Sequence, residues 1–246
     1  MSVSKPNRDE ELEVARRVMA GLLPRRPPAL PGFDVAGAYE TSREVGGDYY
    51  EFIALGDDRW GIAIADVVGK GIAAALLVAA VRASLFALVT HDLAQRAILR
   101  RANQFFHESA EEGKYVTLFY AVLDVASRRF IYVNAGHPPP VVLRQNGDFE
   151  LMEEGGVPLG LFEDPRYREG FAHLNHGEVL AMYTDGITEA VNEQDEPYGL
   201  ERMTAVLARA RHGSAASMCD ALIQDVRRFS GGALQDDQTV VVLKAL

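Results

Sequence analysis

Cysteine is nearly absent from this 246-residue chain, which contains only Cys219. A single cysteine cannot form an intrachain disulfide, so the sequence excludes a disulfide-stapled scaffold and indicates a reducing compartment. Residues 1–13 are polar and charged and lack the apolar segment of a signal peptide. We therefore expect a cytoplasmic protein.

Long apolar runs are also scarce, and acidic residues outnumber basic ones. The longest apolar run, residues 72–89, contains Arg82 and Ser84 and is rich in alanine. A lipid-facing helix would not hold that arginine cheaply, so the run predicts a helix buried in a soluble core. The chain has 25 Lys+Arg against 35 Asp+Glu and a formal net charge of −10. We expect no nucleic-acid or membrane partner, because both are polyanions, and we expect a divalent cation or a basic partner instead.

The N-terminal region predicts an amphipathic helix over residues 8–23. Four apolar residues recur on one face at helical spacing: Leu12, Ala15, Met19 and Leu22. The run PRRPP at residues 24–28 ends the helix, because proline lacks an amide donor and restricts the residue before it. This apolar stripe packs either on the core of its own chain or on a second copy, which would make a homodimer.

Apolar periodicity and turn residues divide the rest of the chain into strands and helices. Strands are predicted at residues 35–40, 49–53, 61–65, 115–124, 130–134, 141–144, 149–152, 178–184 and 239–244. Further helices are predicted at residues 72–89, 93–107, 200–210 and 215–229. Several strands are joined by hairpin-length links, so the sheets are mostly antiparallel. The expected fold is α+β, with two packed sheets covered by helix pairs.

Several carboxylates stand at the predicted strand boundaries. Asp48 precedes one strand, Asp66 and Asp185 each end one, and Asp236 and Asp237 precede the last. An isolated aspartate at such a place is usually a turn residue. Here glycines neighbour the acids, and in antiparallel sheets starts and ends of strands lie side by side, so these acids can converge on one edge.

Converging carboxylates repel one another, and bound cations remove that repulsion. Hard oxygen ligands without histidine or cysteine favour Mg²⁺ or Mn²⁺ over Zn²⁺. Two such ions a few ångströms apart could hold a shared water, lower its pKa and clamp a phosphoryl group for in-line attack.

Six short motifs occur in a fixed order along the chain. They are REVGGDYY (43–50), ADVVGKG (65–71), NAGHP (134–138), GVPLG (156–160), YTDGITEA (183–190) and DDQT (236–239). In that order the chain resembles the bacterial stage-II-E/sigma-regulator branch of the metal-dependent (type 2C, PPM) serine/threonine phosphatases. The resemblance covers nearly the whole chain.

The resemblance implies an α/β-β/α sandwich with two Mn²⁺ or Mg²⁺ ions on one edge. Residues 1–28 would be a helical extension and residues 29–246 the catalytic domain. By position, Asp66 would bridge both ions, and Asp185 and Asp236 would complete the ligands of one. Asp48 and the backbone carbonyl of Val67 would serve the other ion. Asp237 would be an outer group or a third-ion ligand.

Three positions depart from the family pattern or leave a role open. Glu51 stands where the family commonly has aspartate, and we interpret it as peripheral. The phosphate-gripping arginine of the eukaryotic branch has no clear match, which leaves Arg43 and Lys70 as weak candidates. His137 is either a general acid for the leaving oxygen or a structural turn residue, and we favour the second.

The resemblance implies a phosphatase that acts on phosphoserine or phosphothreonine of an anti-anti-sigma-type regulatory protein. The short extension holds no sensor domain, so we expect an activating partner. One alternative is a dinucleotide-binding oxidoreductase, because GKGIAA at residues 69–74 fits the pattern G-x-G-x-x-A. The other is a binding module of the same fold with a dead site.

The sequence also predicts that Cys219 is not a nucleophile. Thiol phosphatases need an arginine six residues after the cysteine, and here that residue is Asp225. Cys219 shares helical spacing with apolar residues, so we expect a buried thiol with a raised pKa. Cys219→Ser should retain turnover of an aryl phosphate, with at most a modest loss of stability. Loss of turnover in the folded variant, or a trapped phosphocysteine, would overturn direct attack by water.

Overall fold

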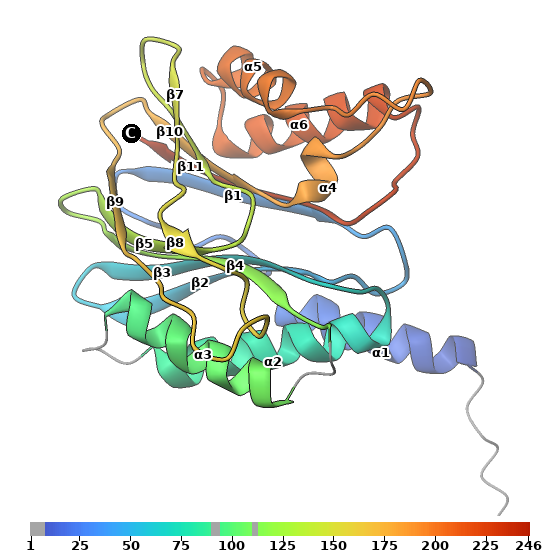
Figure 1. The fold of residues 1–246 in the computed structure, drawn as a ribbon. Helices are drawn as coiled ribbons and strands as arrows, with labels where there is room; N and C mark the ends of the chain where they lie inside the picture. The colour runs from blue at the N-terminus through green and yellow to red at the C-terminus, as the bar shows by residue number, and fades with distance from the viewer. Residues whose placement is uncertain (1–7, 90–93, 110–112) are drawn as a thin grey trace, which may run out of the picture.

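Two β-sheets pack face to face, and helices cover the outer face of each in a computed structural model that describes residues 8–89, 94–109 and 113–246 (Figure 1). The five-stranded sheet has the order β1-β11-β10-β6-β7. The second sheet has the order β2-β3-β4-β5-β8, with β9 also paired to β5. Almost all pairs are antiparallel, and the short β5–β8 pair is parallel. The predicted α+β sandwich of two mostly antiparallel sheets is confirmed.

The strands are β1 (Phe33–Glu40), β2 (Asp48–Gly56), β3 (Arg59–Val67), β4 (Val116–Asp124), β5 (Arg129–Ala135), β6 (Val141–Leu143), β7 (Phe149–Leu151), β8 (Gly155–Gly156), β9 (Gly170–His173), β10 (Val179–Tyr183) and β11 (Gln238–Ala245). The helices are α1 (Arg8–Leu22), α2 (Ile72–Leu88), α3 (Gln95–Ser109), α4 (Asp185–Thr188), α5 (Leu200–Ala210) and α6 (Ala215–Phe229). Every predicted element is present, with ends shifted by a few residues at most. Leu93, where the second core helix was predicted to begin, lies outside the described residues. The structure adds β8, β9 and α4.

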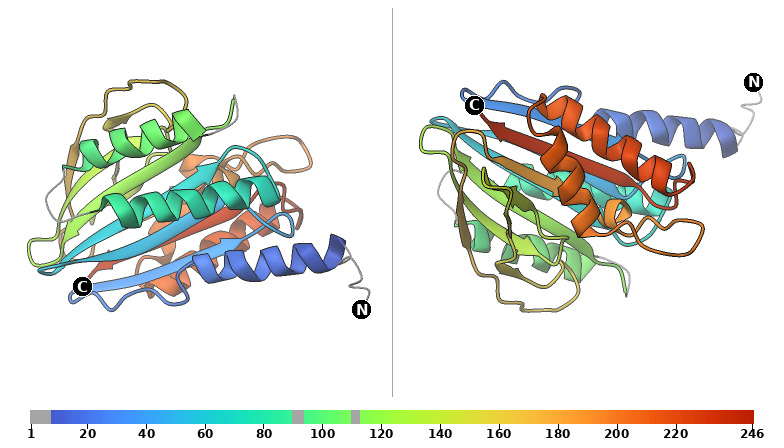
Figure 2. Two further views of the ribbon diagram at one scale, coloured as in Figure 1. Left: turned by 90° about the horizontal axis from the view of Figure 1, so that it is seen from below. Right: turned by 90° about the horizontal axis from the view of Figure 1, so that it is seen from above.

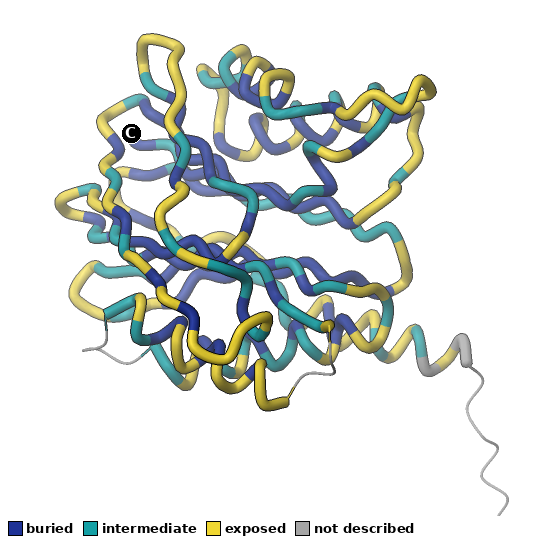
Figure 3. The backbone as a smooth tube through the Cα atoms, viewed as in Figure 1, coloured by how far each residue is buried: buried dark blue, intermediate teal, exposed yellow. Residues whose placement is uncertain are grey.

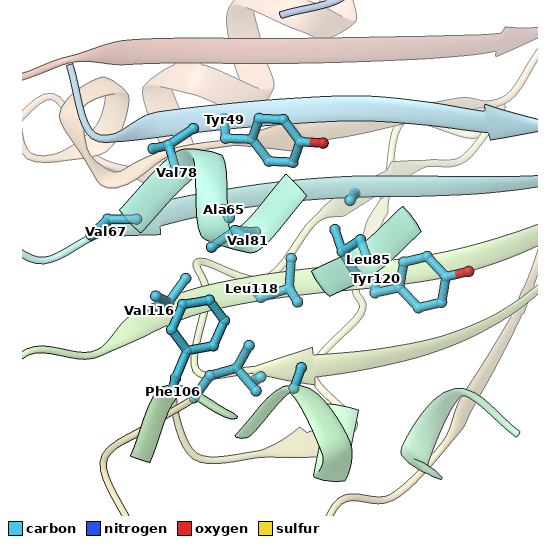
Figure 4. Packing of buried hydrophobic residues seen from close by; sticks show 14 of the residues in the cluster. Tyr49, Ala65, Val67, Val78, Val81, Leu85, Phe106, Val116, Leu118 and Tyr120 are labelled. Carbon is cyan, nitrogen blue, oxygen red and sulfur yellow. The ribbon is translucent and has the colours of Figure 1, made fainter. Parts of the chain in front are cut away.

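Apolar side chains fill three layers, and the buried tube segments in Figure 3 follow them. The middle layer lies between the sheets and includes Ile62, Phe119 and Val241. One outer layer lies between the five-stranded sheet and helices α5 and α6. The other lies between the second sheet and helices α2 and α3, where Val81 and Leu85 of α2 face the sheet (Figure 4). Burial on this scale is the dominant favourable term in folding.

Glu51 joins the second sheet to α2. Successive side chains of a strand point to opposite faces, so Glu51 points away from the side that holds Asp48. Arg82 of α2 donates from Nε to Glu51 Oε2 at 3.1 Å, and its guanidinium lies 4.7 Å from the ring centroid of Phe86. Glu51 is thus a buried partner of α2, which agrees with the interpretation that it is peripheral to the acids.

Most of the predicted stripe of α1 packs on its own chain. Met19 is buried in the core beneath α2, and Ala15 and Leu22 pack against the same cluster. Figure 2 shows α1 running alongside α2. Three of the four stripe residues therefore pack within the chain, and the homodimer stays a prediction. Val14 and Val18 are large apolar residues of α1 that are exposed.

The segment with the dinucleotide pattern joins β3 to α2, but the elements after it differ from those of a doubly wound sheet. The next helix is α3, and β4 then pairs with β3 in the antiparallel sense. A dinucleotide fold needs a parallel strand at this place. The oxidoreductase alternative is therefore wrong. Among the described residues, no helix combines the length and apolarity needed to cross a membrane.

Neighbouring residues of α1 offer a matched test of its docking. Met19 is 6% exposed and Val18 is 58% exposed. Met19→Ala should lower the free energy of unfolding by about 2 kcal/mol, because it leaves a cavity beneath α2. Val18→Ala should change it by no more than about 0.5 kcal/mol. Denaturant titration measures both, and equal effects would contradict the docked position of α1.

Candidate functional site

Asp48 and Asp66 lie opposite each other at one edge of the sheet that α2 covers. Asp48 is the first residue of β2 and Asp66 is the last but one of β3. The antiparallel register pairs them directly. The amide of Val67 then donates to the carbonyl of Gly47 at 3.2 Å, which continues the pairing past the two acids. Two carboxylates are thereby fixed side by side by backbone geometry alone.

The other sheet brings Asp185 and Asp236 to the same edge. Asp185 begins α4 directly after β10, and Asp236 stands just before β11. These two strands are antiparallel neighbours, so an acid after one lies beside an acid before the other. Gly186 comes so close to the carbonyl of Asp237 that a Cβ would collide with that oxygen. Figure 1 shows α4 at the end of the sandwich where the chain enters β2.

Asp48 joins the two sheets through hydrogen bonds. Its Oδ2 accepts from the hydroxyl of Thr184 at 2.7 Å and from the hydroxyl of Thr239 at 2.6 Å. Thr184 in turn accepts at Oγ1 from the amide of Thr239 at 3.0 Å. Thr239 lies in β11 and Thr184 directly follows β10, so both threonines come from the opposite sheet or its end. This fully buried group therefore holds the two acid pairs together.

Asp237 anchors the loop that leads into β2. Its Oδ2 accepts from the amide of Gly47 at 2.7 Å. Its Oδ1 accepts from the amide of Ser42 at 2.8 Å and from the hydroxyls of Ser42 and Thr41 at 3.0 and 3.1 Å. Both oxygens are therefore engaged by the loop, which fixes the backbone just before Asp48.

The crowded acids raise one another's pKa values. Burial and the charges of Asp185, Asp236 and Asp237 raise the pKa of Asp66 from 3.8 to about 7. Burial and the charge of Asp66 raise the pKa of Asp48 well above its ordinary value. Burial and the charges of Glu189 and Asp236 raise the pKa of Asp185. The carboxylates at this edge would therefore be stabilised by a bound cation.

The donor set suits a hard cation, although its present arrangement is not a closed ligand shell. Within residues 8–89, 94–109 and 113–246, no three His, Cys, Asp or Glu side chains are arranged to hold a metal ion. Asp236 Oδ1 lies 2.8 Å from Lys70 Nζ. Carboxylate and carbonyl oxygens are the ligands that Mg²⁺ and Mn²⁺ prefer, so these residues could hold such ions.

His137 is a structural link beside the acids. It is buried, and its Nε2 donates to the carbonyl of Tyr183 at 3.1 Å. Its Nδ1 accepts from the hydroxyl of Thr117 at 2.8 Å, and Thr117 is the residue paired with Asp66 on β4. Burial lowers the pKa of His137 to about 3, so the ring is neutral at physiological pH. Both nitrogens are engaged, which agrees with the structural role and leaves no proton for a leaving oxygen.

Sequence reasoning identified the acids but missed the hydroxyls that hold them. Thr184 and Thr239 both occur inside the quoted motifs, one residue before Asp185 and two after Asp237. Their position next to the acids was the one signal in the sequence that could have identified them as partners. The thiol of Cys219 lies elsewhere, buried between β11 and α6, and burial raises its pKa to about 12, as the sequence predicted.

Comparison with known proteins places the chain in a family. The family model for stage II sporulation protein E (SpoIIE) matches residues 56–246. The phosphoserine phosphatase RsbU of Bacillus subtilis is 28% identical over 95% of this chain and 70% of its own length. The next two curated relatives are longer, and the chain spans 41% and 47% of their lengths.

Solved structures share the fold. The SiaA-PP2C domain of Pseudomonas aeruginosa superposes with a TM-score of 0.85 at 18% identity and covers 96% of both chains. RsbX, solved in complex with magnesium, has a TM-score of 0.65 at 16% identity over 87% of this chain and 96% of RsbX. The chain therefore belongs to the SpoIIE family and is a PP2C-type serine phosphatase.

Proposed function

We propose that this chain is a metal-dependent phosphatase that hydrolyses phosphoserine or phosphothreonine on a protein. The observation that carries the proposal is the meeting of hard-oxygen groups from both sheets at one edge, where the pKa of Asp66 rises to about 7. Such crowding is unfavourable in an ordinary turn, and it is the environment in which divalent cations bind well.

Each acid has a role in this proposal that agrees with its place in the fold. Asp66 would bridge two ions, since the charges of three other aspartates act on it. Asp185 and Asp236 would complete the ligands of one ion, and Asp48 and the carbonyl of Val67 would serve the other. Asp237 fits an outer role, because both of its oxygens hold the loop at residues 41–47. Two Mn²⁺ or Mg²⁺ ions, when bound, lower the pKa of water and neutralise phosphoryl charge.

The protein's own side chains favour direct attack by water. Cys219 is buried against β11, with Sγ 4.0 Å from the carbonyl of Val240. His137 is neutral and engaged at both nitrogens. Neither group can act as the nucleophile of a covalent phospho-enzyme. The residues at the edge therefore bind and orient, and no covalent intermediate on the chain is expected.

The substrate we propose is a phosphorylated anti-anti-sigma-type regulatory protein, whose dephosphorylation would free it to bind an anti-sigma factor. Support comes from the relationship to RsbU, a phosphoserine phosphatase. An activating partner would supply the input. Incubation with candidate phosphoproteins from the same cell, with and without Mn²⁺, tests this part of the proposal.

Removal of the cation or of its central ligand should abolish turnover. With p-nitrophenyl phosphate as probe, excess EDTA should stop hydrolysis and Mn²⁺ should restore it. Asp66→Asn should lower kcat/KM by more than about a hundredfold, because it removes the bridging carboxylate, and Asp185→Asn should lose most activity. Asp164→Asn is the matched control, since that carboxylate is 82% exposed. Full turnover in EDTA would refute metal dependence, and an inactive wild type with every candidate substrate would favour the dead binding module.

The raised pKa of Asp66 predicts a pH dependence in chelator. Its folded pKa of about 7 exceeds the ordinary 3.8, so the folded protein binds this proton more tightly than the unfolded chain. The stability from this group is complete below pH 3.8 and is lost as the pH rises through 7. In EDTA, Asp66→Asn should therefore raise the melting temperature more at pH 8 than at pH 5. Equal increments at both pH values would contradict the crowding of these acids.

A further inference from the structure

Two of the chain's four lysines lie in or against the loop that follows Asp66. Lys70 Nζ lies 2.8 Å from Asp236 Oδ1 and donates to the carbonyl of Gln235 at 3.2 Å. An ammonium group has three N–H donors, so one of them is not used by these contacts. The side chain is 32% exposed. Lys70 is therefore held at the acids and still open to a ligand from solvent.

Lys114 approaches the same loop. Gly69 has φ +121°, a conformation that favours glycine, and a Cβ there would lie 3.1 Å from Lys114 Nζ. The ammonium of Lys114 therefore packs over the residue just before Lys70. The amide of Val68 donates to the carbonyl of Tyr115 at 3.1 Å, which ties this loop to the chain beside Lys114. The backbone thus holds both lysines near one place.

The negative charge at the edge suggests that these lysines help to bind phosphate, an inference that rests on the proposed function. Five aspartates gather there: Asp48, Asp66, Asp185, Asp236 and Asp237. Glu189 adds a sixth carboxylate, since its charge acts on Asp185. Two divalent cations would leave two negative charges uncompensated, so the loaded edge would still repel a phosphate dianion. Two ammonium groups would offset that remaining charge, and lysine is a common phosphate ligand.

We propose that Lys70 and Lys114 together form the phosphoryl-binding cation pair of this enzyme. They would replace the phosphate-binding arginine of the eukaryotic branch, which has no clear match in this chain. Arg43 is the competing group, because it is exposed in the loop that Asp237 anchors. Lys70 differs from Arg43 in its contact with Asp236, which fixes its ammonium among the acids. The pair would select for a dianionic phosphoryl group.

Binding of inorganic phosphate to the Mn²⁺-loaded protein tests the proposal by calorimetry, apart from turnover. Lys70→Gln and Lys114→Gln should each raise the Kd for phosphate about tenfold or more, which is the worth of a charge-assisted hydrogen bond. Lys70→Arg should retain most of the affinity. With p-nitrophenyl phosphate, the glutamine variants should raise KM and the Ki for phosphate more than they lower kcat.

Lys244→Gln is the matched control, because Lys244 lies at the opposite end of β11 from Asp236 and Asp237. Its Nζ donates to the carbonyl of Gly213, between α5 and α6, at 2.7 Å. Its Kd for phosphate should equal that of the wild type. Wild-type affinity in both Lys70→Gln and Lys114→Gln, or a loss confined to Arg43→Gln, would overturn the pair. Should Lys70→Gln fail to fold, Lys114→Gln and Lys70→Arg decide the question.

Two outcomes separate this inference from the proposed function. Hydrolysis that needs Mn²⁺ and Asp66 but ignores both lysines would overturn only the cation pair. Hydrolysis that survives EDTA would overturn the metal-dependent mechanism, whatever the lysines do. A metal-loaded wild type that does not bind phosphate would also overturn the pair.

Discussion

Repulsion between carboxylates at one edge is the constraint on which the rest of this structure depends. Asp66 is acted on by the charges of Asp185, Asp236 and Asp237, and burial adds to their effect. Each acid is stabilised differently. Asp48 accepts hydrogen bonds from two threonine hydroxyls, and Asp237 accepts them from the loop that leads into β2. Asp236 forms an ion pair with Lys70. Asp66 and Asp185 have the fewest donors, which makes them the sites of greatest demand for a cation.

The three apolar layers make this arrangement tolerable. A cluster of like charges costs stability, and only a well-packed core can offset that cost. The acids sit at strand ends, where they leave the layers intact. Residues within the strands next to them are fully buried, such as Ala65 beside Asp66 and Val240 after Thr239. Strand ends are also where the backbone can turn freely, so glycines such as Gly186 can let two segments meet closely.

Much of the fold could be predicted because its signals are local. The structure places α5 and α6 at Leu200–Ala210 and Ala215–Phe229, the ranges that apolar periodicity predicted. The β2–β3 hairpin has Asp57 and Asp58 in the left-handed region, as expected of a tight two-residue turn. By contrast, β8, β9 and α4 are two to four residues long, too short to show a period. Their existence depends on neighbours distant in the sequence.

The candidate site likewise has features that the sequence predicts and features that only the structure shows. The positions of the acids at strand boundaries were readable from the sequence, because each follows or precedes a recognisable apolar run. The hydroxyl partners of Asp48 were not, since Thr184 and Thr239 lie 136 and 191 residues away from it in the chain. The choice between roles for His137 also needed structure, because burial and two specific partners decide it.

The division of the acids between two sheets makes site geometry depend on how the sheets pack. Asp48 and Asp66 belong to strands of the sheet that α2 covers. Asp185 follows β10 and Asp236 precedes β11, two strands of the sheet that α5 and α6 cover. Any sliding of one sheet over the other would have to break the hydroxyl bonds of Asp48. The same motion would strain the link from Thr117 through His137 to Tyr183. These buried polar bridges fix the register that the apolar layer between the sheets leaves loosely defined, because apolar contacts are not directional.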